Sequence, residues 1–143
     1  MNTTDQLTQV FYDNFVAYYR SHAAHANVTG RTFRSDHKML QGVYERRQAQ
    51  IDILGELLRT LQEFMPTDLS EIINNSDLPT DPIEGTADEL LNMVMADLLQ
   101  LCDCYKELNE VAEEDDHDEI ANYAQEQILD LNKSIWMLRS VLD

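Results

Sequence analysis

The chain has 143 residues, a length that suits one domain spanning residues 1–143. Its apolar fraction of 43% is too high for a disordered chain, and its four Gly and three Pro leave few turns, which favours an all-α protein. A formal charge of −17 with no basic patch or tail disfavours direct binding to DNA. No apolar run reaches the roughly 20 residues of a membrane helix, and the polar N-terminus lacks a secretory signal, so a cytoplasmic protein is expected.

Apolar residues spaced three or four apart predict two long helices in the first half of the chain. The first is expected to begin at a cap on Thr3 or Thr4 and to end at the Asn27–Gly30 break. The second is expected from about Thr32 to Phe64, because Met65-Pro66 cannot continue it.

The second half of the chain is expected to hold one short helix and two further long ones. Thr67 can cap a short helix that ends near Ile73, and a loop rich in Asn, Asp and Pro follows as far as Pro82. Thr86 and Glu89 have the spacing of a capping box and open the third long helix, which a run of acids separates from the fourth. These elements predict a four-helix bundle with a short extra helix between the second and third.

A polar stripe lies beside the apolar stripe of the second long helix. At 100° per residue, five positions fall within about 80° of one another: His37, Gln41, Tyr44, Gln48 and Asp52. A purely solvated face would more naturally oppose the core, so this position indicates an interface or a site. Asp52 and Glu56, one turn apart, can aim at one point, and with neutral imidazoles from His25 and His37 they suit iron or zinc. The residues alone also allow ordinary solvated acids and packed histidines.

The pattern of these residues is similar to that of a known family. His22–Phe33, followed by His37, Tyr44, Asp52 and Glu56, resembles the signature of Dps proteins, which are mini-ferritins of the ferritin-like superfamily. Ile135–Arg139 resembles the family's last helix, and the resemblance extends over nearly the whole chain. It implies a ferritin-like four-helix bundle, a homo-oligomeric shell of twelve subunits, and a ferroxidase centre at each two-fold interface.

The resemblance also implies a function and a set of ligands. His25 and His37 of one subunit, with Asp52 and Glu56 of its partner, would bind iron, or zinc in its place. The protein would then oxidise Fe(II) with peroxide or oxygen, store ferric mineral inside the shell, and protect the cell from peroxide damage.

Two positions depart from the family pattern. Ala26 stands where the family usually has Trp, and Gln41 stands where it often has an acid, so a second iron is expected to bind weakly. These departures leave open an alternative, a shell or bundle without ferroxidase turnover that acts as a structural or metal-binding protein. The basic N-terminal extension with which some members bind DNA is not seen.

An acidic run precedes the fourth long helix. In the family, acids at the start of the last helix line three-fold pores that admit cations, and the corresponding candidates here are Glu113, Asp115, Asp116 and Asp118. The alternative is that these acids simply cap a helix, because Asp is favourable near a helix N-terminus.

Overall fold

The computed structural model describes all 143 residues and contains five helices and no strands. Four are long and one is short: α1 Thr3–Asn27, α2 Phe33–Thr60, α3 Leu69–Asn75, α4 Ala87–Glu114 and α5 Asp118–Leu142. The all-α prediction, with a short helix between the second and third long ones, is confirmed. None of the helices combines the length and apolar character that crossing a membrane requires.

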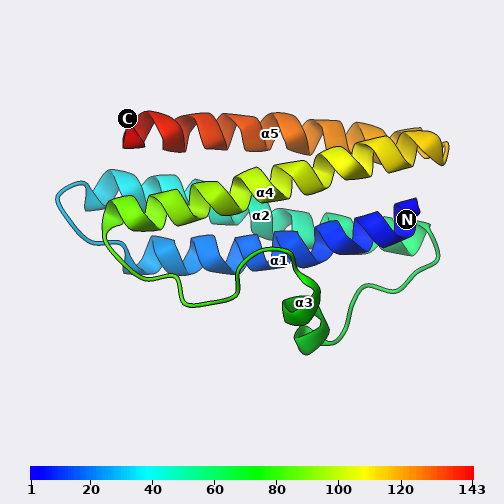
Figure 1. Ribbon diagram of the computed structural model, residues 1–143, viewed down its shortest axis with the longest axis horizontal. Helices are drawn as coiled ribbons and strands as arrows, with labels where there is room; N and C mark the ends of the chain where they lie inside the picture. Colours follow the sequence, from blue (N-terminus) through cyan, green and yellow to red (C-terminus); the bar gives the residue numbers. More distant parts are fainter.

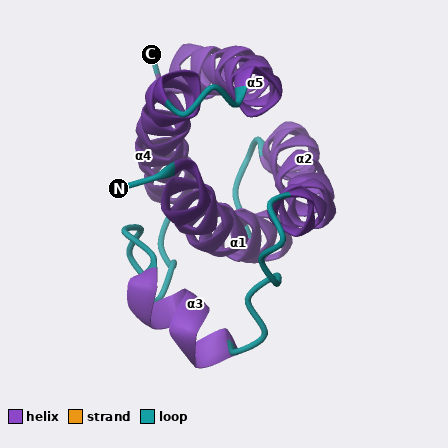
Figure 2. Ribbon diagram, turned by 90° about the vertical axis from the view of Figure 1, so that its right-hand side faces the viewer, coloured by secondary structure: helices purple, strands orange, loops and turns teal.

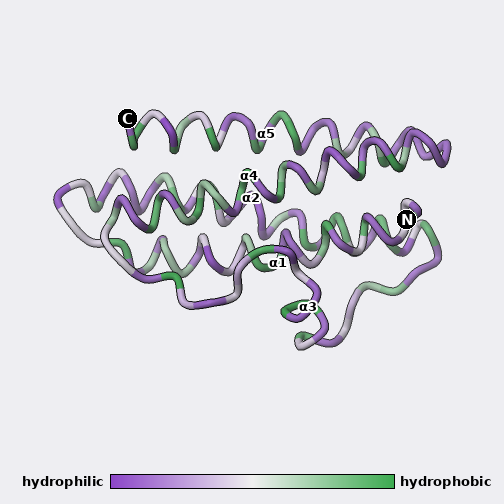
Figure 3. Tube along the Cα trace, in the orientation of Figure 1, coloured by the Kyte–Doolittle hydropathy of each residue, from purple (hydrophilic) through white to green (hydrophobic).

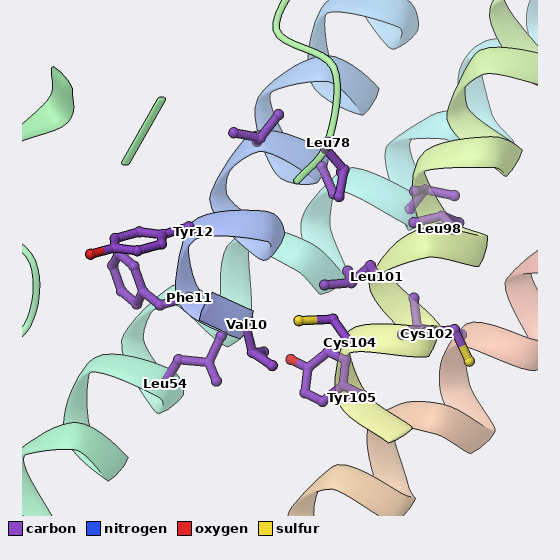
Figure 4. Packing of buried hydrophobic residues seen from close by; sticks show 14 of the residues in the cluster. Val10, Phe11, Tyr12, Leu54, Leu78, Leu98, Leu101, Cys102, Cys104 and Tyr105 are labelled. Atoms are coloured by element: carbon purple, nitrogen blue, oxygen red, sulfur yellow. The ribbon is translucent and has the colours of Figure 1, made fainter. Parts of the chain in front are cut away.

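The four long helices lie side by side, and α3 stands beside α1 on the long connection between α2 and α4 (Figures 1 and 2). Hydrophilic and hydrophobic residues alternate along each long helix (Figure 3), as expected when one face packs inward. The 31 buried apolar side chains form one cluster, part of which Figure 4 shows. Cys102 and Cys104 are free and buried, and their sulfurs lie on opposite sides of α4.

α2 and α5 approach each other less closely than the other neighbouring pairs of long helices (Figure 2), and long polar side chains connect them. Arg47 Nη2 donates to Asp130 Oδ2 at 2.8 Å, and the Tyr123 hydroxyl donates to Gln50 Oε1 at 2.7 Å. The Tyr105 hydroxyl lies 3.1 Å from that of Tyr123, and burial raises the pKa of Tyr105 to about 12. This polar layer therefore joins α2 to α5.

The second helix ends earlier than the sequence predicts. α2 stops at Thr60 rather than Phe64, because Gln62 adopts a left-handed φ of 64°. The Gln62 N–H donates to the Arg59 carbonyl and the Glu63 N–H donates to the Leu58 carbonyl, both at 3.0 Å, which is a Schellman ending. A glutamine rather than a glycine at this position gives no sequence signal of a stop.

Two of the predicted helix caps are also wrong by one residue. Asn2, not Thr3 or Thr4, caps α1, and its side chain accepts a hydrogen bond from the Asp5 N–H. Asp68, not Thr67, caps α3. The capping box of Thr86 and Glu89 at the start of α4 is confirmed in both directions, with bonds of 3.0 and 3.2 Å.

Candidate metal centre

The two candidate histidines meet across the turn between α1 and α2. His25 lies in the last turn of α1 and His37 in the first turns of α2, and their rings stack with centroids 3.7 Å apart. His25 Nδ1 lies 2.7 Å from the His37 carbonyl oxygen, and His37 Nδ1 lies 2.8 Å from the His25 carbonyl oxygen. The Asn27–Gly30 break makes this pairing possible, because it returns the chain so that α2 runs back beside α1 (Figure 1).

These reciprocal contacts determine which ring nitrogen can bind a metal. A carbonyl oxygen only accepts hydrogen bonds, so Nδ1 of each histidine must carry the proton. In the neutral ring the lone pair is then on Nε2, for both His25 and His37. Metal-binding histidines characteristically donate their other N–H to a carbonyl or carboxylate in this way. The pair therefore fits the imidazole half of an iron or zinc site.

The two candidate acids lie exposed on the outer side of α2. They lie one helical turn apart on α2, and a hydrogen bond with Asp52 and the negative charge of Asp52 raise the pKa of Glu56. A divalent cation between them would neutralise the repulsion. The pair therefore fits the carboxylate half of a metal site.

One chain does not bring the two halves together. His37 and Asp52 are separated by fifteen residues of the same helix, which at 1.5 Å per residue is about 22 Å along its axis. No three His, Cys, Asp or Glu side chains in the chain are grouped so that they could hold a metal ion. The candidate ligands thus form two separate pairs, His25 with His37 at the α1–α2 turn and Asp52 with Glu56 further along α2.

A second aromatic cluster adjoins the histidine pair, and the sequence analysis did not identify it. His22 stacks on Tyr44 with ring centroids 3.9 Å apart and an interplanar angle of 2°. The Tyr18 hydroxyl lies 3.0 Å from His22 Nδ1, and the Tyr44 ring lies 5.0 Å from that of His25. The spacing of four residues between Tyr18 and His22 was the available signal, because side chains at that spacing share one helix face.

Gln41, one of the two residues that differ from the family pattern, lies one turn beyond His37. It is half-buried, and its Nε2 donates to Glu45 Oε1 at 2.8 Å. Ala26 is exposed at the end of α1, so no large ring covers the histidine pair from that position. The structure therefore places both departures next to the histidine half-site.

The four candidate pore acids are all exposed around the turn between α4 and α5. Asp115 Oδ2 accepts hydrogen bonds from the Thr3 N–H at 2.8 Å and from the Thr3 hydroxyl at 2.7 Å, and these bonds lower the pKa of Asp115. Asp116 has a left-handed φ of 61°, and Asp118 is the first residue of α5. Asp115 thus ties the start of α1 to this turn, while Glu113, Asp116 and Asp118 lack such a tie to α1.

An apolar groove lies between α1 and α3. It has a volume of about 420 Å³ and is lined mainly by apolar side chains, among them Phe15, Tyr19, Leu69 and Ile73. Tyr19 and Leu69 are 66% and 65% exposed, a large exposure for apolar side chains that lie next to each other.

Comparison with known proteins gives the same family by sequence and by structure. A family model, described as "Ferritin-like domain", matches residues 4–143. The "DNA protection during starvation protein" of Helicobacter pylori is 29% identical over 143 residues, which are 99% of each chain. The protein of the same name from Brevibacillus brevis is 25% identical over 128 residues, covering 90% of this chain and 86% of that one.

Solved structures superpose over almost the whole chain. The CAIP protein of Helicobacter cinaedi has a TM-score of 0.92 at 27% identity, covering 99% of this chain and 100% of that one. A Dps protein from Bacillus brevis has a TM-score of 0.93 at 23% identity, covering 99% and 95%. The Dps protein of Vibrio cholerae, described as a member of a superfamily of ferritin-like diiron-carboxylate proteins, has a TM-score of 0.93 at 19% identity, covering 99% and 89%.

Proposed function

The chain belongs to the ferritin-like family, and within it to the Dps proteins, and on that premise we propose that it is an iron-sequestering ferroxidase. Fe(II) is the substrate, peroxide or oxygen accepts its electrons, and ferric mineral collects inside a shell of twelve subunits. The ligands are His25, His37, Asp52 and Glu56. Zinc fits the same donors but cannot undergo the redox step, so it would occupy the site as an inhibitor.

The observation that carries this proposal is the pair of half-sites on α2. Tyr44 and Glu45 lie halfway between His37 and Asp52. Two antiparallel copies of α2, related by a two-fold axis near these residues, would place His37 of one copy level with Asp52 of the partner subunit. Because a two-fold interface repeats every contact, this pairing of two subunits would complete two sites at once.

The apolar groove between α1 and α3 supports the same assembly. Its exposed Tyr19 and Leu69 would remain in water in a lone chain, and burial in a subunit contact stabilises such side chains by about 25 cal/mol per Å². We expect light scattering to give a particle near twelve subunits. A stable monomer at micromolar concentration would contradict both the shell and the split site.

The acids at the turn between α4 and α5 are proposed to attract cations to the shell. Glu113, Asp116 and Asp118 carry this role, while Asp115 contributes its charge although Thr3 already binds its carboxylate. Converging acids raise the local concentration of Fe(II) and so its rate of entry.

Direct DNA binding is not part of the proposal. Each of the twelve copies would bring a formal charge of −17, and phosphate backbones are repelled by such a surface. We expect no retardation of duplex DNA at physiological salt in the presence of a chelator. Any protection of DNA by this protein would then come from removal of iron and peroxide, which needs no contact with DNA.

Complementation between two inactive variants tests the split site. In a shell of His37→Ala chains every site lacks one imidazole, and in a shell of Asp52→Ala chains every site lacks one carboxylate. When the two chains are co-expressed and mix at random, half of the two-fold pairs contain both. Each mixed pair has one site with all four ligands, so about a quarter of all sites are intact.

We expect each parent shell to oxidise Fe(II) slowly with peroxide and the mixed shell to recover about a quarter of the wild-type amplitude in stopped-flow measurements. The matched control is a mixed shell of His37→Ala and His25→Ala chains, in which no pair regains a complete site. A mixed shell as slow as its parents would show that the site is not shared. Parents as fast as wild type would show that these residues are not ligands.

A Dps-type shell without turnover is the second candidate, and Gln41 favours it because a neutral amide stands beside the histidine half-site. Such a shell would bind metal in the wild type but would consume no peroxide. Iron-dependent loss of peroxide, measured on purified shells, distinguishes the two candidates.

A further inference from the structure

Tyr18 and His22 form a hydrogen-bonded pair one turn along α1 from the proposed ligand His25. The Tyr18 hydroxyl is 3.0 Å from His22 Nδ1, and both side chains are partly buried. The parallel stack of His22 on Tyr44, at 3.9 Å and 2°, holds the imidazole in place from the α2 side. The pair therefore has a fixed geometry and a fixed proton contact although the proposed ligand set does not include it.

Ring contacts connect this pair to the histidine half-site. The centroid of the His22 ring is 6.1 Å from that of His25, and the Tyr44 ring lies 5.0 Å from His25. His25 itself stacks on His37 at 3.7 Å. Aromatic rings thus extend without a gap from Tyr18 to both imidazoles proposed to bind iron.

The proposed chemistry leaves one electron unaccounted for. Two imidazoles and two carboxylates are a suitable set for one Fe(II), and one Fe(II) gives one electron. Hydrogen peroxide takes two electrons when it is reduced to hydroxide. If iron alone supplied an electron, the other product would be a hydroxyl radical, which would damage the protein and its surroundings.

We propose that Tyr18 supplies the second electron, with His22 as the acceptor of its proton. The step converts Fe(II), H₂O₂ and the neutral Tyr18–His22 pair into Fe(III), two hydroxide ions, a Tyr18 phenoxyl radical and a protonated His22. One O–O bond breaks, iron and Tyr18 are each oxidised by one electron, and the phenolic proton moves to Nδ1 of His22. A later Fe(II) ion reduces the radical and the proton returns, which regenerates the pair.

The hydrogen bond is what makes Tyr18 suitable for this role. A phenol that loses an electron becomes a very strong acid, so oxidation is far easier when an acceptor already contacts its proton. The proposal assigns to His22 the tautomer in which Nδ1 accepts from the hydroxyl and Nε2 carries the proton. Tyr19 is the natural control, because it is 66% exposed and no hydrogen bond to its hydroxyl is present.

This inference rests on the proposed ferroxidase function, and one experiment separates the two. Wild-type shells and their Tyr18→Phe, His22→Phe and Tyr19→Phe variants receive one Fe(II) per site and one equivalent of peroxide without oxygen. Absorbance follows the oxidation of iron, freeze-quenched electron paramagnetic resonance detects radicals, and a spin trap captures hydroxyl radical. Ring-deuterated tyrosine identifies the radical, because deuteration narrows the signal only if the spin is on a tyrosine.

We expect a tyrosyl signal in the wild type and in Tyr19→Phe, and loss of most of it in Tyr18→Phe, which also releases more hydroxyl radical to the trap. His22→Phe keeps the ring but removes the proton acceptor, and it should lose the signal in the same way. If iron is oxidised but the radical is absent from the wild type or unchanged in Tyr18→Phe, this inference is wrong and the ferroxidase function stands. If the wild type does not oxidise iron with peroxide, both are wrong.

Discussion

The interior of the bundle and the outer face of α2 use charged residues in opposite ways. Inside, Arg20 Nε contacts Asp97 Oδ2 at 2.7 Å, and Arg47 contacts Asp130 at 2.8 Å, so the charges are paired within one chain. On the outer face, Asp52 and Glu56 lie one turn apart on α2 without a basic side chain paired to either, and Asp52 raises the pKa of Glu56. These two interior arginines therefore find their partners within a single chain, whereas the two outer-face acids do not.

The difference separates residues that stabilise the fold from residues available for function. A buried charge without a partner strongly destabilises a protein, so folding itself requires the interior pairs. Asp52 and Glu56 repel each other, yet water screens that repulsion, and folding has no need of them. Their side-by-side arrangement is consistent with the cation site proposed above.

Removing one partner of an interior pair should have the largest effect. The Arg20 and Asp97 side chains are 9% and 4% exposed, so Arg20→Ala leaves a buried carboxylate unpaired and should cost about 3–5 kcal/mol of unfolding free energy at neutral pH. Burial already raises the pKa of Asp97 against the opposing effect of Arg20, and the variant should raise it further. Denaturant unfolding, followed by circular dichroism, measures the loss.

The pH dependence of this loss follows from the sign of the shift. A carboxyl group whose pKa is raised by folding binds a proton more tightly in the folded state, so it destabilises the fold as pH rises above its unfolded value. The deficit of Arg20→Ala should therefore shrink in acid. The control is Arg20→Met with Asp97→Leu, which leaves no charge behind and should recover much of the stability. An equal loss in the double variant would argue against the unpaired charge as the cause.

Gln41→Asp tests whether an added acid on the outer face of α2 strengthens metal binding. It adds a charge one turn from His37 and should tighten Fe(II) binding by about tenfold, or ~1.4 kcal/mol, and raise the iron content per site. The matched control, Gln41→Glu at the same position, tests whether charge or reach matters. Anaerobic calorimetry with Fe(II) measures both quantities. Unchanged affinity in both variants would place Gln41 outside the site.

Thr86→Ala should have a smaller effect, and on stability only. It removes the hydroxyl that accepts from the Glu89 N–H at 3.2 Å, a cap that contributes about 1 kcal/mol. Thr86→Ser keeps the hydroxyl and should remain close to wild type in thermal unfolding. Iron oxidation should not change, because the start of α4 belongs to the self-contained bundle. A change in iron oxidation would mean that the two regions are coupled.

Asp52→Asn should have the smallest effect on the metal-free protein. An amide in place of the carboxyl group can donate to Glu56 and carries no charge, so the pKa of Glu56 should fall towards its ordinary value. Carbon-detected NMR of the Glu56 carboxyl group during a pH titration measures this. A pKa that stays raised would show that Asp52 is not the cause. The proposal that Asp52 and Glu56 bind one cation together would then lose its support.

The sequence predicts the bundle well because helical periodicity records which face each helix buries. It predicts the end of α2 poorly, because the left-handed turn at Gln62 depends on backbone hydrogen bonds that any residue can make. The burial of Arg47 is likewise not obvious from the sequence, because arginine is seldom buried. Its position four residues after Val43 and seven before Leu54, both buried, was the available signal.

The candidate site is predicted in part for a similar reason. Spacing alone groups His37 with Asp52 on one face of α2, and spacing alone also shows that 15 residues separate them. The tautomers of His25 and His37 depend on carbonyl groups of the opposite helix, which no residue pattern reveals. The stack of His22 on Tyr44 likewise joins two helices and required the structure.

The crossed hydrogen bonds of His25 and His37 hold both rings in fixed orientations. Each ring is held by the backbone that carries the other, so neither imidazole can rotate without breaking a bond of 2.7 or 2.8 Å. The two donors lose their rotational freedom when the helical hairpin forms, before any ion arrives. A chelator of fixed bite discriminates between ions by their radius and preferred geometry, whereas a flexible one adjusts to each. In the proposed site, the contribution of the two imidazoles to selectivity among divalent cations is therefore set when the α1–α2 hairpin folds, before the acids of the partner subunit join them.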